Sequence, residues 1–191
     1  LDQPTDEFLD YALWRAFREL KERWLPAVQN GEFDFEGKPE HLVYALQSLG
    51  ASEAVASLVR LAKGKPNREK RSLDIWEIVS QVGDTAQLNE VWKVVADKQV
   101  SARAKARLLD GLIQSKRERG IDSMPSLAIL SHILADRNKM VKRSAIEAAG
   151  EFVVKGADLI LRNMEASNDL DSESRQRLYW ALGRYRSWLN E

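Results

Sequence analysis

The chain has 191 residues, with 29 Lys and Arg side chains against 29 Asp and Glu side chains, and 44% of its residues are hydrophobic. This balance is typical of a folded globular protein and argues against a disordered tail or a protein that binds polyanions through bulk charge. A chain of this length buries roughly 70% of the surface that its unfolded form exposes, so a core can form without disulfides or a structural metal. The sequence has no cysteine, which excludes disulfide frameworks, thiolate metal sites and thiol nucleophiles.

The hydrophobic pattern predicts an all-α protein. Apolar residues recur at spacings of three and four along the chain, whereas glycine occurs 10 times and proline 5 times. Residues that favour helix starts, such as Asp6, Asp84, Ser101 and Asn138, divide this pattern into ten short helices, the first of which we expect to bend or end by Pro26. The predicted helices cover residues 6–26, 39–50, 52–64, 67–83, 84–97, 101–118, 125–135, 138–154, 157–167 and 171–188.

Apolar positions also repeat at the length of a helix pair. Steps of 33, 33, 33, 37 and 33 residues connect equivalent positions. These steps lead from Leu9 to Leu42, Ile75, Leu108, Ala145 and Leu178. They also lead from Ala12 to Ala45, Ile78, Gly111, Ala148 and Ala181, and from Leu13 to Leu46, Val79, Leu112, Ala149 and Leu182. The longer step falls at residues 119–123, where turn residues predict a longer loop.

A repeated helix pair of this length is typical of an α-solenoid, because one pair buries its apolar face only against its neighbours. The small residue in the series that begins at Ala12 lets two helices approach closely. We therefore predict a single α-solenoid domain over residues 1–191, with five to six helix pairs and a repeat of about 33 residues.

Residues 136–150 resemble the inner helix of a HEAT repeat. An acidic turn residue, Asp136, is followed by Val141 with the basic Lys142, and then by small residues up to Gly150. Lys105 and Arg175 stand in register with Lys142, the basic position of the family. The resemblance implies a right-handed HEAT-like solenoid of the armadillo type, whose function is to present a surface to other proteins.

Residues 7–50 resemble the HEAT region of large bacterial cell-envelope proteins described as membrane-bound dehydrogenases with a haem-binding domain. The residues that carry this resemblance are 7–14 and 24–27. It implies that the chain is a fragment of a longer protein of the periplasm or cell envelope. The catalytic and haem-binding parts would lie outside these residues, so we expect no cofactor, metal or catalytic residue here.

The sequence offers no convincing catalytic arrangement. Ser131, His132 and Asp136 lie on or beside one predicted helix. One helix cannot place a nucleophile, a base and an oxyanion hole around a single atom. We therefore expect a protein that is not an enzyme.

The expected partner surface follows one layer of helices. Stacked helix pairs curve so that residues at the same repeat position form a continuous strip, and we predict that this strip includes Trp14, Lys105, Lys142 and Arg175. Trp14 and Trp180 are the tryptophans that we expect to be exposed, either as contacts or as caps of the terminal repeats. Trp76 shares a register with apolar residues, which predicts a core position.

Charge leaves two functions open. Residues 1–62 hold 11 acidic and 6 basic side chains, whereas residues 63–119 hold 8 and 13. A row formed by Lys105, Lys142 and Arg175 could contact phosphates, as in the alkyl-purine DNA glycosylases built from HEAT-like repeats, although interleaved acids such as Glu147 favour a ladder of ion pairs. A continuous positive groove with a tryptophan beside it would favour nucleic acid, and a mixed surface would favour a protein partner or a neighbouring domain of the parent chain.

Overall fold

A computed structural model describes residues 6–30, 32–33, 35–49, 52–63, 70–167 and 170–189 of the chain. Every regular element within these residues is a helix, so the all-α prediction is confirmed there. The helices are α1 (Glu7–Glu19), α2 (Lys21–Asn30), the 3-10 helix η1 (Phe35–Gly37), α3 (Pro39–Ser48), α4 (Ser52–Lys63), α5 (Lys70–Val82), α6 (Thr85–Ala96), α7 (Ala102–Arg119), α8 (Leu127–Leu134), α9 (Lys139–Phe152), α10 (Ala157–Ala166) and α11 (Ser172–Leu189). Gly50, Gly64 and Asn67, three of the expected helix ends, lie outside the described residues.

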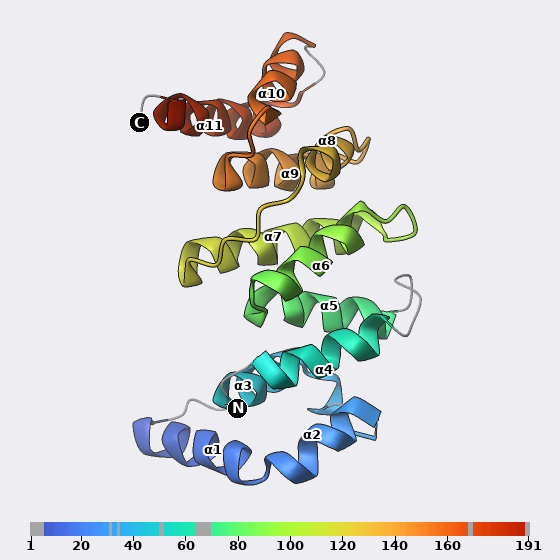
Figure 1. Cartoon of the computed structure of the whole chain (residues 1–191), viewed down its shortest axis with the longest axis vertical. Coiled ribbons are helices and arrows are strands. Elements are labelled where there is room, and N and C mark those ends of the chain that lie inside the picture. The colour runs from blue at the N-terminus through green and yellow to red at the C-terminus, as the bar shows by residue number, and fades with distance from the viewer. Residues whose placement is uncertain are drawn as a thin grey trace. The chain divides into compact units, whose positions relative to one another are not determined.

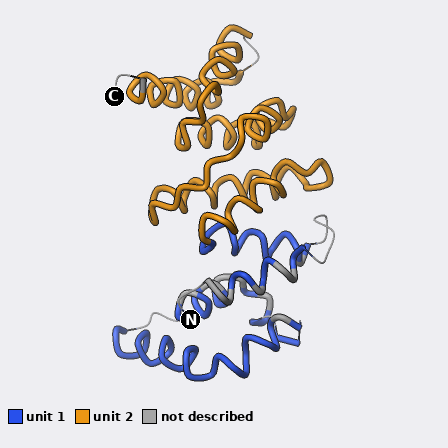
Figure 2. The backbone as a smooth tube through the Cα atoms, in the orientation of Figure 1, with its two compact units in different colours: residues 1–83 blue, residues 84–191 orange. Residues whose placement is uncertain are grey.

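The chain divides into two compact units, residues 1–83 and residues 84–191 (Figure 2). The first unit holds α1 to α5 and the second holds α6 to α11. The expectation that residues 1–191 form one solenoid domain stays a prediction.

In the second unit, the helices form two rows (Figure 1). One row is α7, α9 and α11, where α9 packs against both of its neighbours, and the other row is α6, α8 and α10. Each helix of the second row also packs against the helix that follows it in the chain. The second unit is therefore built from helix pairs, each of which covers the next.

The repeat positions supply the core of this unit. Leu108, Ala145 and Leu178 stand at one repeat position and are 0 to 1% exposed. Leu112 and Ala149 stand at another and are fully buried. The repeat read from the sequence thus marks the faces on which α7, α9 and α11 pack together.

The first unit repeats the two-row pattern at smaller scale. Its helices α1, α3 and α5 pack in one row, while α2 packs against α4 and α4 against α5. The repeat positions of α3 and α5, such as Ala45, Leu46 and Val79, are buried. Those of α1 are not buried, since among the described helices α1 packs in its row against α3 alone, and α1 buries none of its side chains fully.

The first predicted helix is interrupted earlier than expected. It ends at Glu19, with Leu20 as its C-cap, and Pro26 lies inside α2. The indole N–H of Trp24 donates to the carbonyl oxygen of Phe17 at 2.8 Å. This bond satisfies one of the last carbonyls of α1, which would otherwise need the next turn of the helix. The break at Leu20 is thus stabilised by a tertiary contact and not by proline.

The loop between α7 and α8 is longer than the equivalent connections between α5 and α6 and between α9 and α10, as predicted. Gly120 caps α7 with φ of 65°, a left-handed conformation that favours glycine. The chain then runs without helix to Ser126, the N-cap of α8. Within this loop the carbonyl oxygen of Ser123 accepts a hydrogen bond from the indole of the buried Trp92 at 2.7 Å.

Candidate functional site

A shallow hollow of about 520 Å³ lies on the exposed side of the row formed by α7, α9 and α11. Helical spacing of three and four residues places its lining side chains on one face of each helix. The residues that line it are Ala106, Asp110, Ile113, Gln114, Arg117, Glu118, Met140, Arg143, Ser144, Glu147, Glu173 and Arg177. A second depression shares four of these residues and adds Gln176 and Trp180. We call the residues of both depressions the charged face.

Arg117 links α7 to α9. Its guanidinium lies 3.0 Å from Glu147 and 3.0 Å from Glu151, which are one helical turn apart on α9. Burial alone would lower the pKa of Arg117, but the hydrogen bonds and charges of Glu151 and Glu147 outweigh this and raise it. Arg117 therefore stays a cation that two carboxylates hold in place.

Glu147 also connects α9 to α11. Its second oxygen accepts a hydrogen bond at 2.9 Å from Arg177, which lies 3.1 Å from Glu173 on its own helix. Arg143 on α9 forms ion pairs with the same Glu173 and, at 3.0 Å, with Asp171. The three helices are thus joined by a continuous series of ion pairs in which each arginine contacts two carboxylates.

Asp171 anchors one end of this network. It accepts a hydrogen bond at 2.8 Å from the backbone N–H of Ser174, in the first turn of α11. This bond and the Arg143 guanidinium hold the pKa of Asp171 well below its usual range. Asp171 therefore combines a helix cap with an ion pair to the neighbouring helix.

Trp180 forms the aromatic edge of the charged face. It is 40% exposed, and the Arg117 guanidinium lies 5.7 Å from its ring centroid. The ring also lies against α9 at Gly150: a Cβ on Gly150 would be 2.6 Å from a ring carbon of Trp180. The expectation that Trp180 is exposed is confirmed, and the absence of a side chain at Gly150 allows its close approach.

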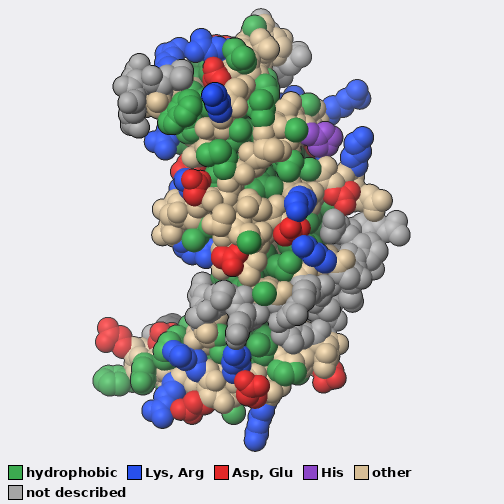
Figure 3. Space-filling model, in the orientation of Figure 1, with side chains coloured by type: hydrophobic (Ala, Val, Ile, Leu, Met, Phe, Trp, Pro, Cys, Tyr) green, Lys and Arg blue, Asp and Glu red, His purple; other side chains and the backbone are tan. Residues whose placement is uncertain are grey.

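The charged face carries both signs of charge. Arg117, Arg143 and Arg177 are matched by Glu147, Glu173 and further carboxylates that line the same hollow. Figure 3, which shows one face of the molecule, likewise shows Lys and Arg side chains among Asp and Glu side chains over the second unit. Such a surface suits a partner that itself carries charges of both signs and polar groups.

The basic row predicted from the sequence lies elsewhere. Lys105, Lys142 and Arg175 occupy equivalent positions of α7, α9 and α11, but none of them lines the hollow. Lys105 is only 8% exposed, and its ammonium group lies 3.5 Å from Asp136. This differs from the expected exposed row, because Lys105 is on the same side of α7 as the buried Leu109, one helical turn away. Arg175 is exposed and Lys142 is partly exposed.

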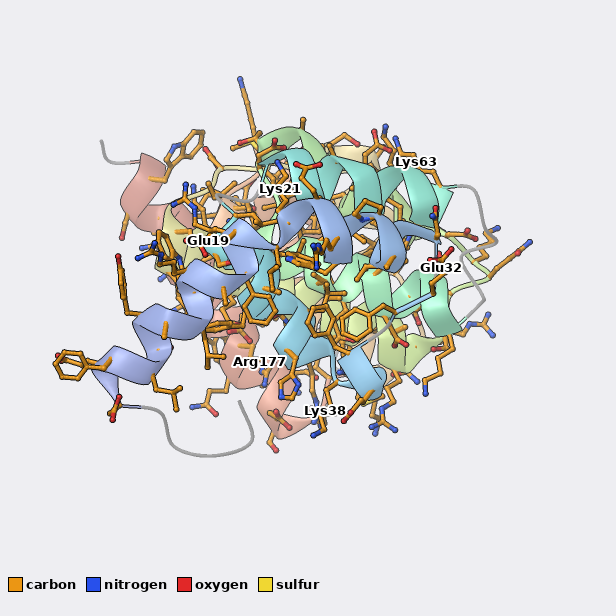
Figure 4. All side chains as sticks on the ribbon, turned by 90° about the horizontal axis from the view of Figure 1, so that it is seen from below. Glu19, Lys21, Glu32, Lys38, Lys63 and Arg177 are labelled. Atoms are coloured by element: carbon orange, nitrogen blue, oxygen red, sulfur yellow. The ribbon has the colours of Figure 1, made fainter. Side chains whose placement is uncertain are left out.

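Trp14, the remaining predicted contact residue, belongs to the first unit. It is 37% exposed, its ring stacks on Tyr11 with centroids 6.2 Å apart, and the Arg18 guanidinium lies 4.7 Å from its ring centroid. Figure 4 shows the side chains of α1, with Glu19 near its C-terminal end and Lys21 at the start of α2. Trp76, by contrast, is 2% exposed, which confirms its predicted place in the core.

Sequence reasoning missed the arginines of the charged face. Arg117, Arg143 and Arg177 stand at different repeat positions, so a search for equivalent positions does not group them. The available signal was the acidic position shared by Asp110 and Glu147, which predicts carboxylates on one face of adjacent helices. It does not show which arginines reach them.

Among the described residues, no group of three or more His, Asp and Glu side chains is placed to hold a metal ion. Within the same residues, no helix combines the length and the apolar character that crossing a membrane requires.

Comparisons with protein-family models, with curated proteins and with solved structures returned no match for this chain. The resemblance to HEAT repeats therefore rests on the repeat and on the residues quoted for it, and stays a prediction.

Proposed function

We propose that this chain is a HEAT-like, right-handed α-solenoid scaffold that binds another protein, or a neighbouring domain of a longer parent chain, through the charged face. Two observations support the solenoid: equivalent helices recur at steps of 33 to 37 residues, and α7, α9 and α11 pack side by side in a row. The resemblance to cell-envelope proteins makes the periplasm or cell envelope the proposed location. The role is structural and not catalytic.

The observation that carries the proposal is the pairing of charges in the hollow. Each of the three arginines that bridge the helices already contacts two carboxylates. A phosphate backbone would have to displace those carboxylates or lie beside them, and their negative charge would repel it. A protein surface with both acidic and basic groups meets no such repulsion and can exchange ion pairs with the face. The charge pattern therefore favours a protein over the alternative, a nucleic-acid-binding module of the DNA glycosylase kind.

Site-specific photo-crosslinking tests the proposal. A photoreactive amino acid replaces Gln114, an exposed residue that lines the hollow, in the chain expressed in its native host. The matched control carries the same group at Arg162, an exposed position on α10 in the other row of helices. We expect a discrete protein adduct from position 114 and none from position 162.

Further variants define the contact. Replacement of Arg177 by Glu places a carboxylate beside Glu147 and Glu173, so the adduct at position 114 should weaken. Trp14→Ala and Lys142→Glu test the two predicted residues that lie outside the hollow and leave the adduct unchanged if the charged face alone makes the contact. Equal adducts from positions 114 and 162, or a nucleic-acid adduct at position 114, would contradict the proposal.

A further inference from the structure

Helices α9 and α11 pack closely at a glycine. A Cβ on Gly150 of α9 would lie 2.6 Å from a ring carbon of Trp180 and 2.8 Å from the Cα of Ala181. An aromatic residue followed by alanine on α11 thus fills the space above a glycine on α9. This close approach is possible here because Gly150 has no side chain.

Helix α11 has a glycine at the same repeat position, but no described helix packs against it. Gly183 follows Gly150 by 33 residues, so it occupies the same repeat position. Apart from its own turn of α11, no atom of the described residues lies within 4 Å of the place that a Cβ on Gly183 would take. Tyr179, on the same side of α11 one turn earlier, is 54% exposed although its equivalents Trp76, Leu109 and Ile146 are buried. The side of α11 that would receive a further helix is therefore open.

The matching aromatic and alanine pair is found on α1. The repeat steps connect Tyr11 and Ala12 to Trp180 and Ala181. Tyr11 is 61% exposed, Ala12 is exposed, and Phe8, one turn earlier on the same side, is 86% exposed. No element of the described chain covers these three side chains, so α1 presents the groups that α11 presents to α9.

The charges of the two helices are complementary. Helix α11 carries four arginines and one glutamate, and its cap, Asp171, adds a second carboxylate, so the net charge at this helix is positive. Helix α1 carries three carboxylates and two arginines, and its N-cap, Asp6, adds a fourth carboxylate. Opposite net charges favour the approach of these two helices and disfavour pairing of α11 with a second α11.

We propose that the chain associates head to tail with a second copy of itself, in which Tyr11 and Ala12 on α1 of one copy dock above Gly183 on α11 of the other. The contact repeats the α9–α11 packing and continues the row of helices across two molecules. It is heterologous, because the two copies use different surfaces, so each end of a pair remains open to a further copy. The inference uses the repeat register and not the charged face, so it stands or fails separately from the proposed partner.

Sedimentation of the full chain tests the association at concentrations from about 10 µM to about 1 mM, because a contact between two single helices is smaller than a standard interface. Gly183→Arg places a large side chain on the docking surface of α11, and Ala12→Arg does the same on α1, so each variant blocks one of the two surfaces. The matched control is Ala166→Arg, at an exposed position on α10. Circular dichroism verifies that all variants are folded.

The wild type and the control should grow in mass with concentration, and each blocked variant should stay a monomer. A mixture of equal amounts of the two blocked variants should form a pair that grows no further, since the intact α1 of one meets the intact α11 of the other. A monomeric wild type would overturn the proposal. So would self-association of the Gly183→Arg variant at the wild-type level, or a mixture of blocked variants that stays monomeric.

Discussion

Arg117 on α7 donates a hydrogen bond to Glu151 on α9 at 3.0 Å, across 34 residues of sequence. The same guanidinium lies 3.0 Å from Glu147, so two carboxylates of one helix hold one cation of the next. This geometry fixes how far α7 is displaced along α9. It also explains why the charged face is a connected network and not a set of separate surface pairs.

A double-mutant cycle measures this link. We expect Arg117→Ala and Glu151→Ala to couple by about 0.5–1 kcal/mol, since the 44% exposed arginine side chain remains partly screened by water. The readout is the free energy of unfolding from urea titration at low ionic strength. The i,i+4 pair between Arg15 and Glu19, in which both side chains are more than 60% exposed, serves as the control and should couple less. Equal coupling in both cycles would contradict a structural role for Arg117.

The repeat core is tested by truncation of Leu112. This residue is fully buried on α7, so Leu112→Ala should lower the free energy of unfolding by about 2–5 kcal/mol through lost burial and a cavity. Leu159 on α10 is 64% exposed, and Leu159→Ala should change it by less than about 0.5 kcal/mol. Denaturant titration of both variants checks the difference. A loss below about 0.5 kcal/mol for Leu112→Ala would show that the register of α7 is wrong.

The pKa of Asp171 gives stability a defined pH dependence. Its folded-state pKa is depressed by the Ser174 backbone N–H and by Arg143, so its ionised form stabilises the fold. This contribution is complete above the unfolded pKa of about 3.9 and is lost as pH falls toward the depressed folded value. Asp171→Asn keeps a residue that caps helices but removes the charge.

Unfolding free energies of the wild type and of Asp171→Asn should therefore differ at pH 6 and converge as the solution is acidified below about pH 4. A difference that stays constant over this range would show that the ion pair with Arg143 contributes nothing.

Nucleic-acid binding can be excluded or demonstrated by titration with short duplex DNA. We expect no binding tighter than the non-specific level of about 10⁻⁶ to 10⁻⁴ M at physiological salt. Phosphate contacts would reveal themselves by a logarithmic salt slope near −0.9 for each phosphate neutralised. Submicromolar binding that is lost in the Lys142→Glu, Arg175→Glu double variant, both at residues of the predicted row that are at least partly exposed, would replace the scaffold proposal with the glycosylase-like alternative.

The sequence predicted the helices and their repeat because both depend on local signals. Apolar spacing marks the buried side of each helix, and residues such as Asp84 and Ser101 cap their helices through their side chains. The break at Leu20 carries no local signal, since it depends on the Trp24 indole that reaches the Phe17 carbonyl. That contact joins α2 to α1, so it depends on how these two helices pack.

The candidate site was predicted less well, for a geometric reason. Repeat register shows which residues are equivalent, but not which equivalent row faces water. Lys105 lies one turn from the buried Leu109. A small rotation of α7 about its axis decides whether this lysine is buried or exposed. The pairs of Arg117 with Glu147 and of Arg177 with Glu147 each span 30 residues, so they depend on the displacement of neighbouring helices along their axes.

The central claim is that equivalent helices pack in the register of the repeat. Replacing each of two equivalent glycines, Gly150 and Gly183, by alanine tests it most directly. Gly150→Ala should lower the free energy of unfolding by about 1–3 kcal/mol, because the new methyl group meets Trp180 and the backbone of Ala181. Gly183→Ala, with open space around it, should raise the free energy of unfolding by about 0.5–1 kcal/mol, as alanine does in an exposed helix. Opposite signs at low chain concentration, measured by denaturant titration, are the predicted result. Stabilisation by both substitutions would contradict the close packing of α11 on α9 and the register on which the account rests.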